Sequence, residues 1–246
     1  MAPSVEIVVL HPADAEHAQA GGADRLHVCA WPDDAGGTSA LGRSVAPADV
    51  SAVLRSTDLP VRVTLRLSDG LTTQGGEFTR LLGLASQYLS LGAEGLVFGF
   101  LTPDLRVDVD VCHELADSLQ GAPWSFDRAF DQVLDPRQGW RGLQQLPGLD
   151  AVHTAGAVRG MDAGFDDLLA FASQDPTFAA VAVAAGDVHP EHVPWLVRAG
   201  VSRVHLEAEV RPGGSWSKAY VDAAFVRSWR LLLDAATVPG GAAGAG

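Results

Sequence analysis

Short apolar runs alternate with longer, Ala-rich or amphipathic segments along nearly the whole chain. The first run, residues 5–10, is β-branched and interrupted only by Glu6, and the segment after it ends at Gly21 and Gly22. A buried strand followed by a helix with a glycine stop has this pattern. The unit recurs, with predicted strands at 5–10, 25–29, 60–66, 95–99, 124–126, 151–154, 179–184 and 202–206, and predicted helices at 12–21, 47–56, 77–91, 107–119, 136–146, 161–173, 190–199 and 219–236.

Eight strand-then-helix units favour an α/β fold with a parallel sheet covered by helices, because the strands are apolar on both faces. A doubly wound open sheet is the alternative, but no Gly-rich phosphate loop follows any strand. We therefore predict a single-domain (β/α)8 TIM barrel over residues 1–238. Residues 239–246 are Pro, Gly and Ala only, which predicts a flexible tail.

Composition narrows the class of protein. A chain of 246 residues, 47% hydrophobic, has the length of one barrel domain. The formal net charge of −13 opposes attraction to nucleic acid or to anionic membranes. Two cysteines, Cys29 and Cys112, are too few for a disulfide framework and are compatible with reduced thiols. No apolar run is long enough to cross a membrane. These features predict a cytoplasmic protein, with the oligomeric state, a homo-oligomer included, left open.

Three long loops follow predicted strands, at residues 30–46, 67–76 and 207–218. In a barrel they lie on the face that carries enzyme active sites, so we interpret the first two as lids. Tolerated surface insertions are the alternative. Trp31 and Trp216 lie in these loops and are candidates either to cap a ligand or simply to pack.

Ionic side chains interrupt several apolar strands at every second position. In residues 25–29, Arg25, His27 and Cys29 face the barrel axis while Leu26 and Val28 face the helices. The same alternation directs further polar residues inward, namely Glu6, Arg62, Thr64, Arg66, Ser125, Asp127, Arg203, His205 and Glu207. Buried charges are costly unless paired, so this lining needs an explanation.

Two interpretations of the ionic lining remain open. One is a structural salt-bridge network that links Glu6, Asp127 and Glu207 to Arg62, Arg66 and Arg128. The other is a pocket for a small anionic ligand, held by arginines and served by groups that transfer protons. In that case the catalytic candidates are Asp127, His27 and Glu6, and the ligand-binding candidates are Arg25, Arg62, Arg66, Arg128, Thr154 and His205.

Metal ligands are few in this sequence. Cys29 beside His27 forms a two-ligand nucleus to which His205 could add a third ligand, and Cu(I) favours soft sulfur. Cys112 lies in a predicted helix and is interpreted as a core thiol. Ser125 lacks the G-x-S-x-G frame of a catalytic serine.

A series of short motifs follows a fixed order along the chain. The motifs are Val5-Glu6-Ile7, Gly22-Ala23-Asp24-Arg25-Leu26-His27-Val28-Cys29, Gly36-Gly37-Thr38-Ser39, Pro60-Val61-Arg62 leading to Arg66, Gly75-Gly76-Glu77-Phe78, Phe126-Asp127-Arg128-Ala129-Phe130-Asp131, and Thr154-Ala155-Gly156. Over residues 5 to 236 this order resembles the CutC copper homeostasis proteins. The resemblance implies a TIM barrel, a role in copper homeostasis, and copper ion binding through cysteine.

The resemblance also implies which positions agree with the family and which depart from it. The family has the same residue at Glu6, Arg25, Cys29, Arg66, Arg128, Asp131, Thr154 and His205. It has Glu where His27 stands, His where Arg62 and Asp127 stand, and a cysteine where Val8 stands. We therefore expect a divergent member. Three hypotheses stay open: weak Cu(I) binding centred on Cys29, an enzyme for a small anionic metabolite, or a barrel whose polar core is only structural.

Overall fold

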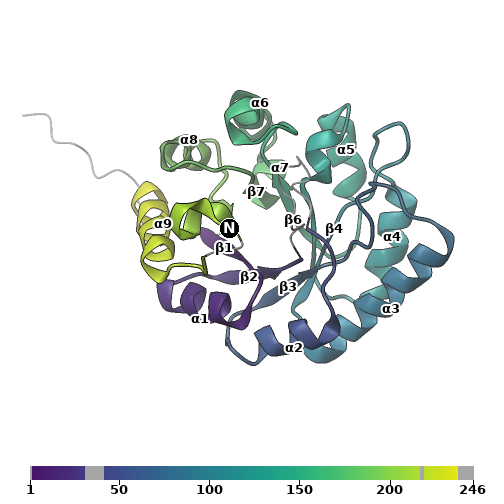
Figure 1. Cartoon of the computed structure of the whole chain (residues 1–246). Helices are drawn as coiled ribbons and strands as arrows, with labels where there is room; N and C mark the ends of the chain where they lie inside the picture. Colours follow the sequence, from purple (N-terminus) through teal and green to yellow (C-terminus); the bar gives the residue numbers. More distant parts are fainter. Residues whose placement is uncertain (1, 31–41, 217–218, 238–246) are drawn as a thin grey trace, which may run out of the picture.

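The computed structural model describes residues 2–30, 42–216 and 219–237. Parallel strands pair in chain order from β1 to β8, and β1 pairs with β8, which closes the barrel (Figure 1). Helix α9 lies beside α1, so the first and the last helix pack against each other on one side of the barrel (Figure 1). The predicted (β/α)8 TIM barrel is confirmed.

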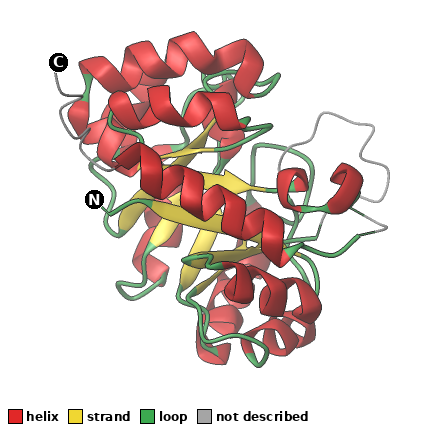
Figure 2. Cartoon of the chain, turned by 90° about the vertical axis from the view of Figure 1, so that its left-hand side faces the viewer, coloured by secondary structure: helices red, strands yellow, loops and turns green. Residues whose placement is uncertain are grey.

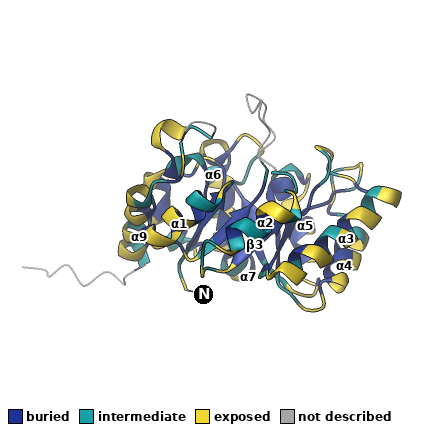
Figure 3. Ribbon diagram, turned by 60° about the horizontal axis from the view of Figure 1, so that its bottom comes forward, coloured by how far each residue is buried: buried dark blue, intermediate teal, exposed yellow. Residues whose placement is uncertain are grey.

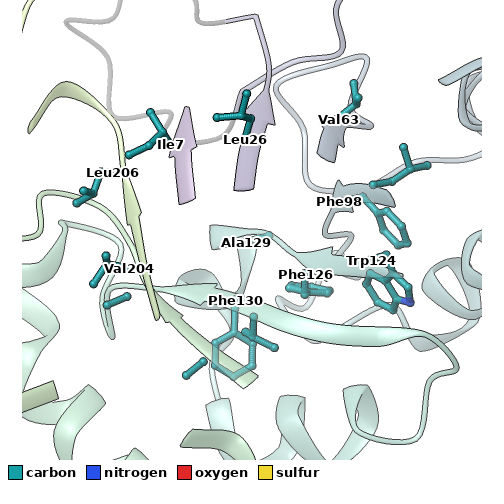
Figure 4. Close-up of a cluster of buried hydrophobic side chains, with 14 of the residues drawn as sticks. Ile7, Leu26, Val63, Phe98, Trp124, Phe126, Ala129, Phe130, Val204 and Leu206 are labelled. Atoms are coloured by element: carbon teal, nitrogen blue, oxygen red, sulfur yellow. The ribbon is translucent and has the colours of Figure 1, made fainter. Parts of the chain in front are cut away.

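The strands are short and rich in β-branched and aromatic residues, which suit a pleated backbone. Their outward side chains form the main core, where Ile7, Leu26 and Val63 lie on neighbouring strands (Figure 4). The strands are β1 (Ser4–Val9), β2 (Arg25–Val28), β3 (Val61–Thr64), β4 (Gly95–Phe98), β5 (Trp124–Phe126), β6 (Leu149–Thr154), β7 (Ala182–Ala184) and β8 (Arg203–Leu206).

Helices surround the strands, with buried faces toward the barrel and exposed faces outward (Figures 2 and 3). Asp108, Asp135 and Asp175 begin α4, α5 and α7 as N-caps, because each carboxylate accepts a backbone N–H of the first turn. The helices are α1 (Pro12–Gly21), α2 (Pro47–Leu54), α3 (Gly75–Leu91), α4 (Val109–Ser118), α5 (Pro136–Leu143), α6 (Met161–Gln174), α7 (Pro176–Val181), α8 (Val193–Arg198) and α9 (Ala223–Thr237).

Three predicted elements begin three or four residues later in the structure. The strand predicted at 179–184 is wrong in its first half, because the Asp175 cap and Pro176 start helix α7, and only Ala182–Ala184 forms β7. The helix predicted at 190–199 begins as a 3-10 turn, Pro190–His192, before α8. The helix predicted at 219–236 begins only at Ala223.

Some predictions fall on residues outside the described ranges. These are most of the first predicted lid with Trp31 and the Gly36-to-Ser39 motif, and the tail at 239–246. Within residues 2–30, 42–216 and 219–237, no helix combines the length and the apolar character needed to cross a lipid bilayer.

Candidate functional site

A layer of polar side chains fills the interior of the barrel. Glu6 on β1, His27 on β2, Thr64 on β3, His153 on β6 and His205 on β8 are each at most 6% exposed. His27 reaches His205 past the intervening strand β1, which is only possible inside the barrel. The alternation of strand side chains therefore places these residues as predicted for β1, β2, β3 and β8.

Four of these residues form a compact cluster, which we call the Glu6/His cluster: Glu6, His27, His153 and His205. Each offers one nitrogen or oxygen atom within 4.8 Å of the others. His27 Nδ1 lies 2.9 Å from His205 Nε2. Glu6 Oε1 lies 3.1 Å from His153 Nε2 and 3.7 Å from His205 Nε2.

The polar atoms of Glu6, His27 and His205 that point away from the cluster contact residues outside it. Arg25 Nε donates to Glu6 Oε2 at 2.5 Å. His27 Nε2 lies 2.7 Å from Thr64 Oγ1, and His205 Nδ1 lies 3.5 Å from Glu207 Oε1. The cluster side chains are thus oriented by partners on neighbouring strands and at the strand ends.

The protonation states of the cluster follow from burial and charge. Burial raises the pKa of Glu6, but the charge of Arg25 and the imidazoles of His153 and His205 outweigh it and hold this pKa well below its usual range. Burial lowers the pKa of His153 to about 4 and, with the charge of His205, that of His27 well below 6.5. Glu6 is therefore ionised at neutral pH, while His27 and His153 are neutral and each keep one nitrogen lone pair.

His205 differs from the other two imidazoles. Burial lowers its pKa, but the nearby carboxylates of Glu207 and Glu6 outweigh burial, so the pKa of His205 is raised. A positive charge on His205 would lie between these two carboxylates. This imidazole is the proton-binding member of the cluster.

The three imidazoles of the cluster face a cavity of about 20 Å³. A water molecule needs roughly 10–15 Å³ of such space, so the cavity accommodates one water molecule or one ion. Its lining residues are Val8, His27, Cys29, Gly42, Thr64, Asp127, Arg128, His153, His205 and Glu207.

Cys29, predicted as the metal ligand, lines this cavity but does not belong to the four-residue cluster. Its side chain is buried beneath Gly42, where a Cβ would lie only 2.7 Å from the Cys29 sulfur. Burial raises the pKa of the Cys29 thiol, and the charge of Glu207 raises it further. The thiol is therefore protonated at neutral pH. Cys112 is buried in α4, as expected for a core thiol.

Asp127, predicted as a catalytic residue, is fully engaged in local structure. Its Oδ2 accepts a hydrogen bond from Arg66 Nη2 at 2.6 Å, and its Oδ1 accepts one from the Ala129 N–H at 2.8 Å. Asp127 thereby caps the 3-10 turn that follows β5. Arg66 also donates to the carbonyl of Gly99. The guanidinium of Arg66 thus already has an anionic partner.

Arg128 and Thr154 converge on a second buried carboxylate, that of Asp131. Arg128 Nε donates to Asp131 Oδ2 at 2.9 Å, and Thr154 Oγ1 donates to Asp131 Oδ1 at 2.6 Å. The Arg128 guanidinium occupies the space beside Gly186, where a Cβ would lie 2.3 Å from Arg128 Cζ. Gly186, at φ +80°, therefore suits this position for both steric and backbone reasons.

Arg62 lies at the amino end of the barrel, away from the mouth at which a ligand was expected. It bonds Asp150 through both terminal nitrogens at 2.6 Å and Glu94 through Nε at 3.1 Å. Ser125 Oγ lies 2.5 Å from Arg62 Nη1. Of the three acidic residues in the predicted salt-bridge network, only Asp127 pairs with an arginine of that network, Arg66. Glu6 pairs instead with Arg25, and Glu207 with His205.

A larger groove of about 540 Å³ lies outside the barrel between α5, α6 and α7. Asp131 and Thr154 border it, but none of the cluster residues does. Its volume suits a small molecule. The three imidazoles and the Cys29 thiol, however, line the smaller cavity.

Sequence reasoning missed His153, although a signal was present. Ala151 and His153 alternate with Val152 in β6, so the rule applied to the other strands would have directed His153 inward. Ala151 and Val152 are both fully buried and only His153 brings a ligand atom.

Comparison with solved structures supports the fold. The chain superposes on the putative copper homeostasis protein CutC from Streptococcus agalactiae with a TM-score of 0.70, at 18% identity, covering 83% of this chain and 98% of that one. It also resembles phosphoribosyl anthranilate isomerase from Thermococcus kodakaraensis, with a TM-score of 0.60 at 16% identity and coverage of 94% and 99%. At these identities the likeness concerns the barrel alone.

Comparison of sequences is more specific. The CutC family protein of Klebsiella pneumoniae strain 342 is 30% identical over 215 residues, covering 86% of this chain and 81% of the relative. The human copper homeostasis protein cutC homolog is 33% identical over 162 residues, covering 62% of this chain and 54% of the human protein. The model of the CutC family matches residues 4–210, which include the whole Glu6/His cluster. With sequence, motif order and barrel in agreement, the chain belongs to the CutC family.

Proposed function

We propose that this protein serves copper homeostasis by holding a copper ion in the cavity inside the barrel. One observation carries the proposal: in a member of a family with relatives named for copper homeostasis, three imidazoles and one thiol line a single cavity of about 20 Å³. Imidazole is a ligand of copper in proteins. The imidazoles are those of His27, His153 and His205, and the protonated Cys29 thiol lines the same cavity.

Unpartnered polar atoms in the cluster fit such an ion. Glu6 Oε1 and His153 Nε2 are buried and make no hydrogen bond of good geometry within the described chain. Buried polar atoms without partners are uncommon and costly, and they call for a ligand, ion or water. An ion bound between Glu6 Oε1 and His153 Nε2 would satisfy both.

The alternative proposal, an enzyme for a small anionic metabolite, has weaker support. Arg66 and Arg128, the predicted anion clamp, already bond Asp127 and Asp131. The cavity beside the catalytic candidates holds about 20 Å³, far below the roughly 300 Å³ at which ligand pockets begin. The large outer groove contains none of those candidates.

Copper retention tests the proposal directly. The purified protein is incubated with Cu2+, or with Cu+ under anaerobic ascorbate, freed of loose metal, and analysed for copper per chain. We expect one ion per chain in the wild type and loss of it in the double variant His27→Gln/His205→Gln. The exposed residue His113 supplies the control variant His113→Gln, which should retain copper. Failure to retain copper in either oxidation state, or full retention by a folded double variant, would refute the proposal.

A further inference from the structure

Some ligand atoms of the Glu6/His cluster lie nearly as close together as in a bound metal centre. Of the six pairs that four atoms form, three lie 2.9, 3.1 and 3.7 Å apart, and the residues offer ligand atoms that all lie within 4.8 Å of one another. Neighbouring donors bound about 2.0–2.1 Å from one ion lie roughly 2.8–3.4 Å apart. Rotations of the side chains that bring the more distant atoms closer would complete such a centre.

The partners around the cluster have the arrangement that orients metal ligands. In metal sites the second nitrogen of a ligating histidine usually meets a carboxylate, carbonyl or water, and ligating carboxylates are themselves hydrogen-bonded. Here Glu207 faces the second nitrogen of His205, and the Thr64 hydroxyl meets that of His27. Arg25 holds Glu6 Oε2 and leaves Glu6 Oε1 directed at the imidazoles.

The chemical types of the four ligand atoms indicate which metal ion they would bind. We infer that Glu6, His27, His153 and His205 together form a complete site for a divalent transition-metal ion, Cu2+ by preference, with Cys29 outside the ligand set. This inference rests on the proposed copper function and specifies its ligands and oxidation state. Three imidazoles and a carboxylate suit borderline divalent ions, among which Cu2+ binds most tightly, whereas Cu+ favours sulfur.

Electron paramagnetic resonance of the protein loaded with Cu2+ alone tests the ligand set. In the wild type we expect hyperfine coupling to imidazole nitrogens. The visible absorption spectrum of the same sample should show no band from charge transfer between thiolate and Cu2+. Cys29→Ser should leave the spectrum and the stoichiometry unchanged. His153→Gln and Glu6→Gln should each weaken Cu2+ binding at least about tenfold, and Zn2+ should compete at the same site but bind less tightly than Cu2+.

Different failures separate the two proposals. If Cys29→Ser loses copper while folded His153→Gln and Glu6→Gln keep it, the thiol holds the ion, so the inference is wrong and the copper function stands. A thiolate charge-transfer band in the wild-type protein leads to the same conclusion without any variant, even if the variants do not fold. If the wild type retains no copper, both proposals fail. Circular dichroism and the His113→Gln control establish that the variants keep the fold.

Discussion

Glu6 is the residue on which the buried polar layer depends most. One oxygen of its carboxylate accepts from Arg25, and the other faces His153 and His205. Because Glu6 is only 1% exposed, its charge is stabilised by these neighbours and not by water. The two lower-pKa imidazoles, His27 and His153, stay neutral beside it because burial disfavours their charged forms.

The buried imidazole of His153 should contribute a loss of stability as pH falls, and it gives the clearest window. In the unfolded chain its pKa is near 6.5, and in the folded protein burial lowers it to about 4. Between these values the unfolded state binds more protons, so the free energy of unfolding decreases from about pH 6.5 down to about pH 4. A shift of this size corresponds to roughly 3 kcal/mol. Glu6 and His27, whose pKa values are also lowered, act in the same direction. His205, Glu209 and Asp131, whose pKa values are raised, oppose them.

Urea unfolding of metal-free protein across this pH range measures the effect. His153→Gln cannot titrate, so its stability should depend less steeply on pH than that of the wild type. His113→Gln, at an exposed site on α4, should match the wild-type slope. Equal slopes for all three proteins would contradict the assignment of a buried neutral imidazole at His153.

Strand β5 and the turn after it show how a short element is anchored by charge. β5 has three residues, Trp124–Phe126, and the chain then enters the 3-10 turn Arg128–Gln132. Asp127 joins the two, because it caps the turn through the Ala129 N–H and binds Arg66, which follows β3. Asp127, which the sequence marked as a candidate for catalysis, therefore holds this turn and Arg66 in place.

Two substitutions of Asp127 separate its charge from its cap. Asp127→Asn keeps a side-chain oxygen for the turn but leaves the buried Arg66 without a negative partner, so we expect a loss of about 3–5 kcal/mol. Asp127→Ala removes the cap as well and should cost about 1 kcal/mol more. Chemical denaturation measures both. If Asp127→Asn is as stable as the wild type, the ion pair contributes nothing to the fold.

The whole barrel brings together ligands from both ends of the chain. His27 and His205 are separated by 178 positions, yet their nitrogens lie 2.9 Å apart. The cluster draws on β1, β2, β6 and β8, so an ion bound there would connect strands that meet only when the barrel closes. Binding would therefore stabilise the complete fold and not a local segment.

Copper should accordingly raise the global stability of the protein. An ion that binds only the folded state contributes about 2.7 kcal/mol at a free concentration about one hundred times its Kd. The unfolding midpoint, followed by circular dichroism, should rise with Cu2+ in the wild type and stay constant in His27→Gln/His205→Gln. Mg2+, which prefers oxygen ligands, should have no effect. An equal rise in the double variant would mean that copper binds elsewhere.

Much of the fold follows from local patterns. Each apolar strand, helix and glycine stop is encoded by neighbouring residues, so the repeating units and the barrel were predictable. Element ends were less so: residues 179–181 read as strand, but the cap at Asp175 and Pro176 draws them into α7. Strand alternation likewise identified Glu6, His27 and His205 as inward-facing, because side-chain direction along a strand has a period of two.

By itself, then, the sequence determined the number of units, their order and which polar residues enter the barrel. Only the tertiary structure decided how those residues pair: Glu6 with Arg25, Arg62 with Asp150, and His153 within the cluster. Partners of this kind lie on different strands, and their distances depend on strand register, barrel closure and side-chain rotamers. None of these is a local property of the chain. The alternation of side chains along a strand therefore predicts which ionic groups face inward, but not which of them pair.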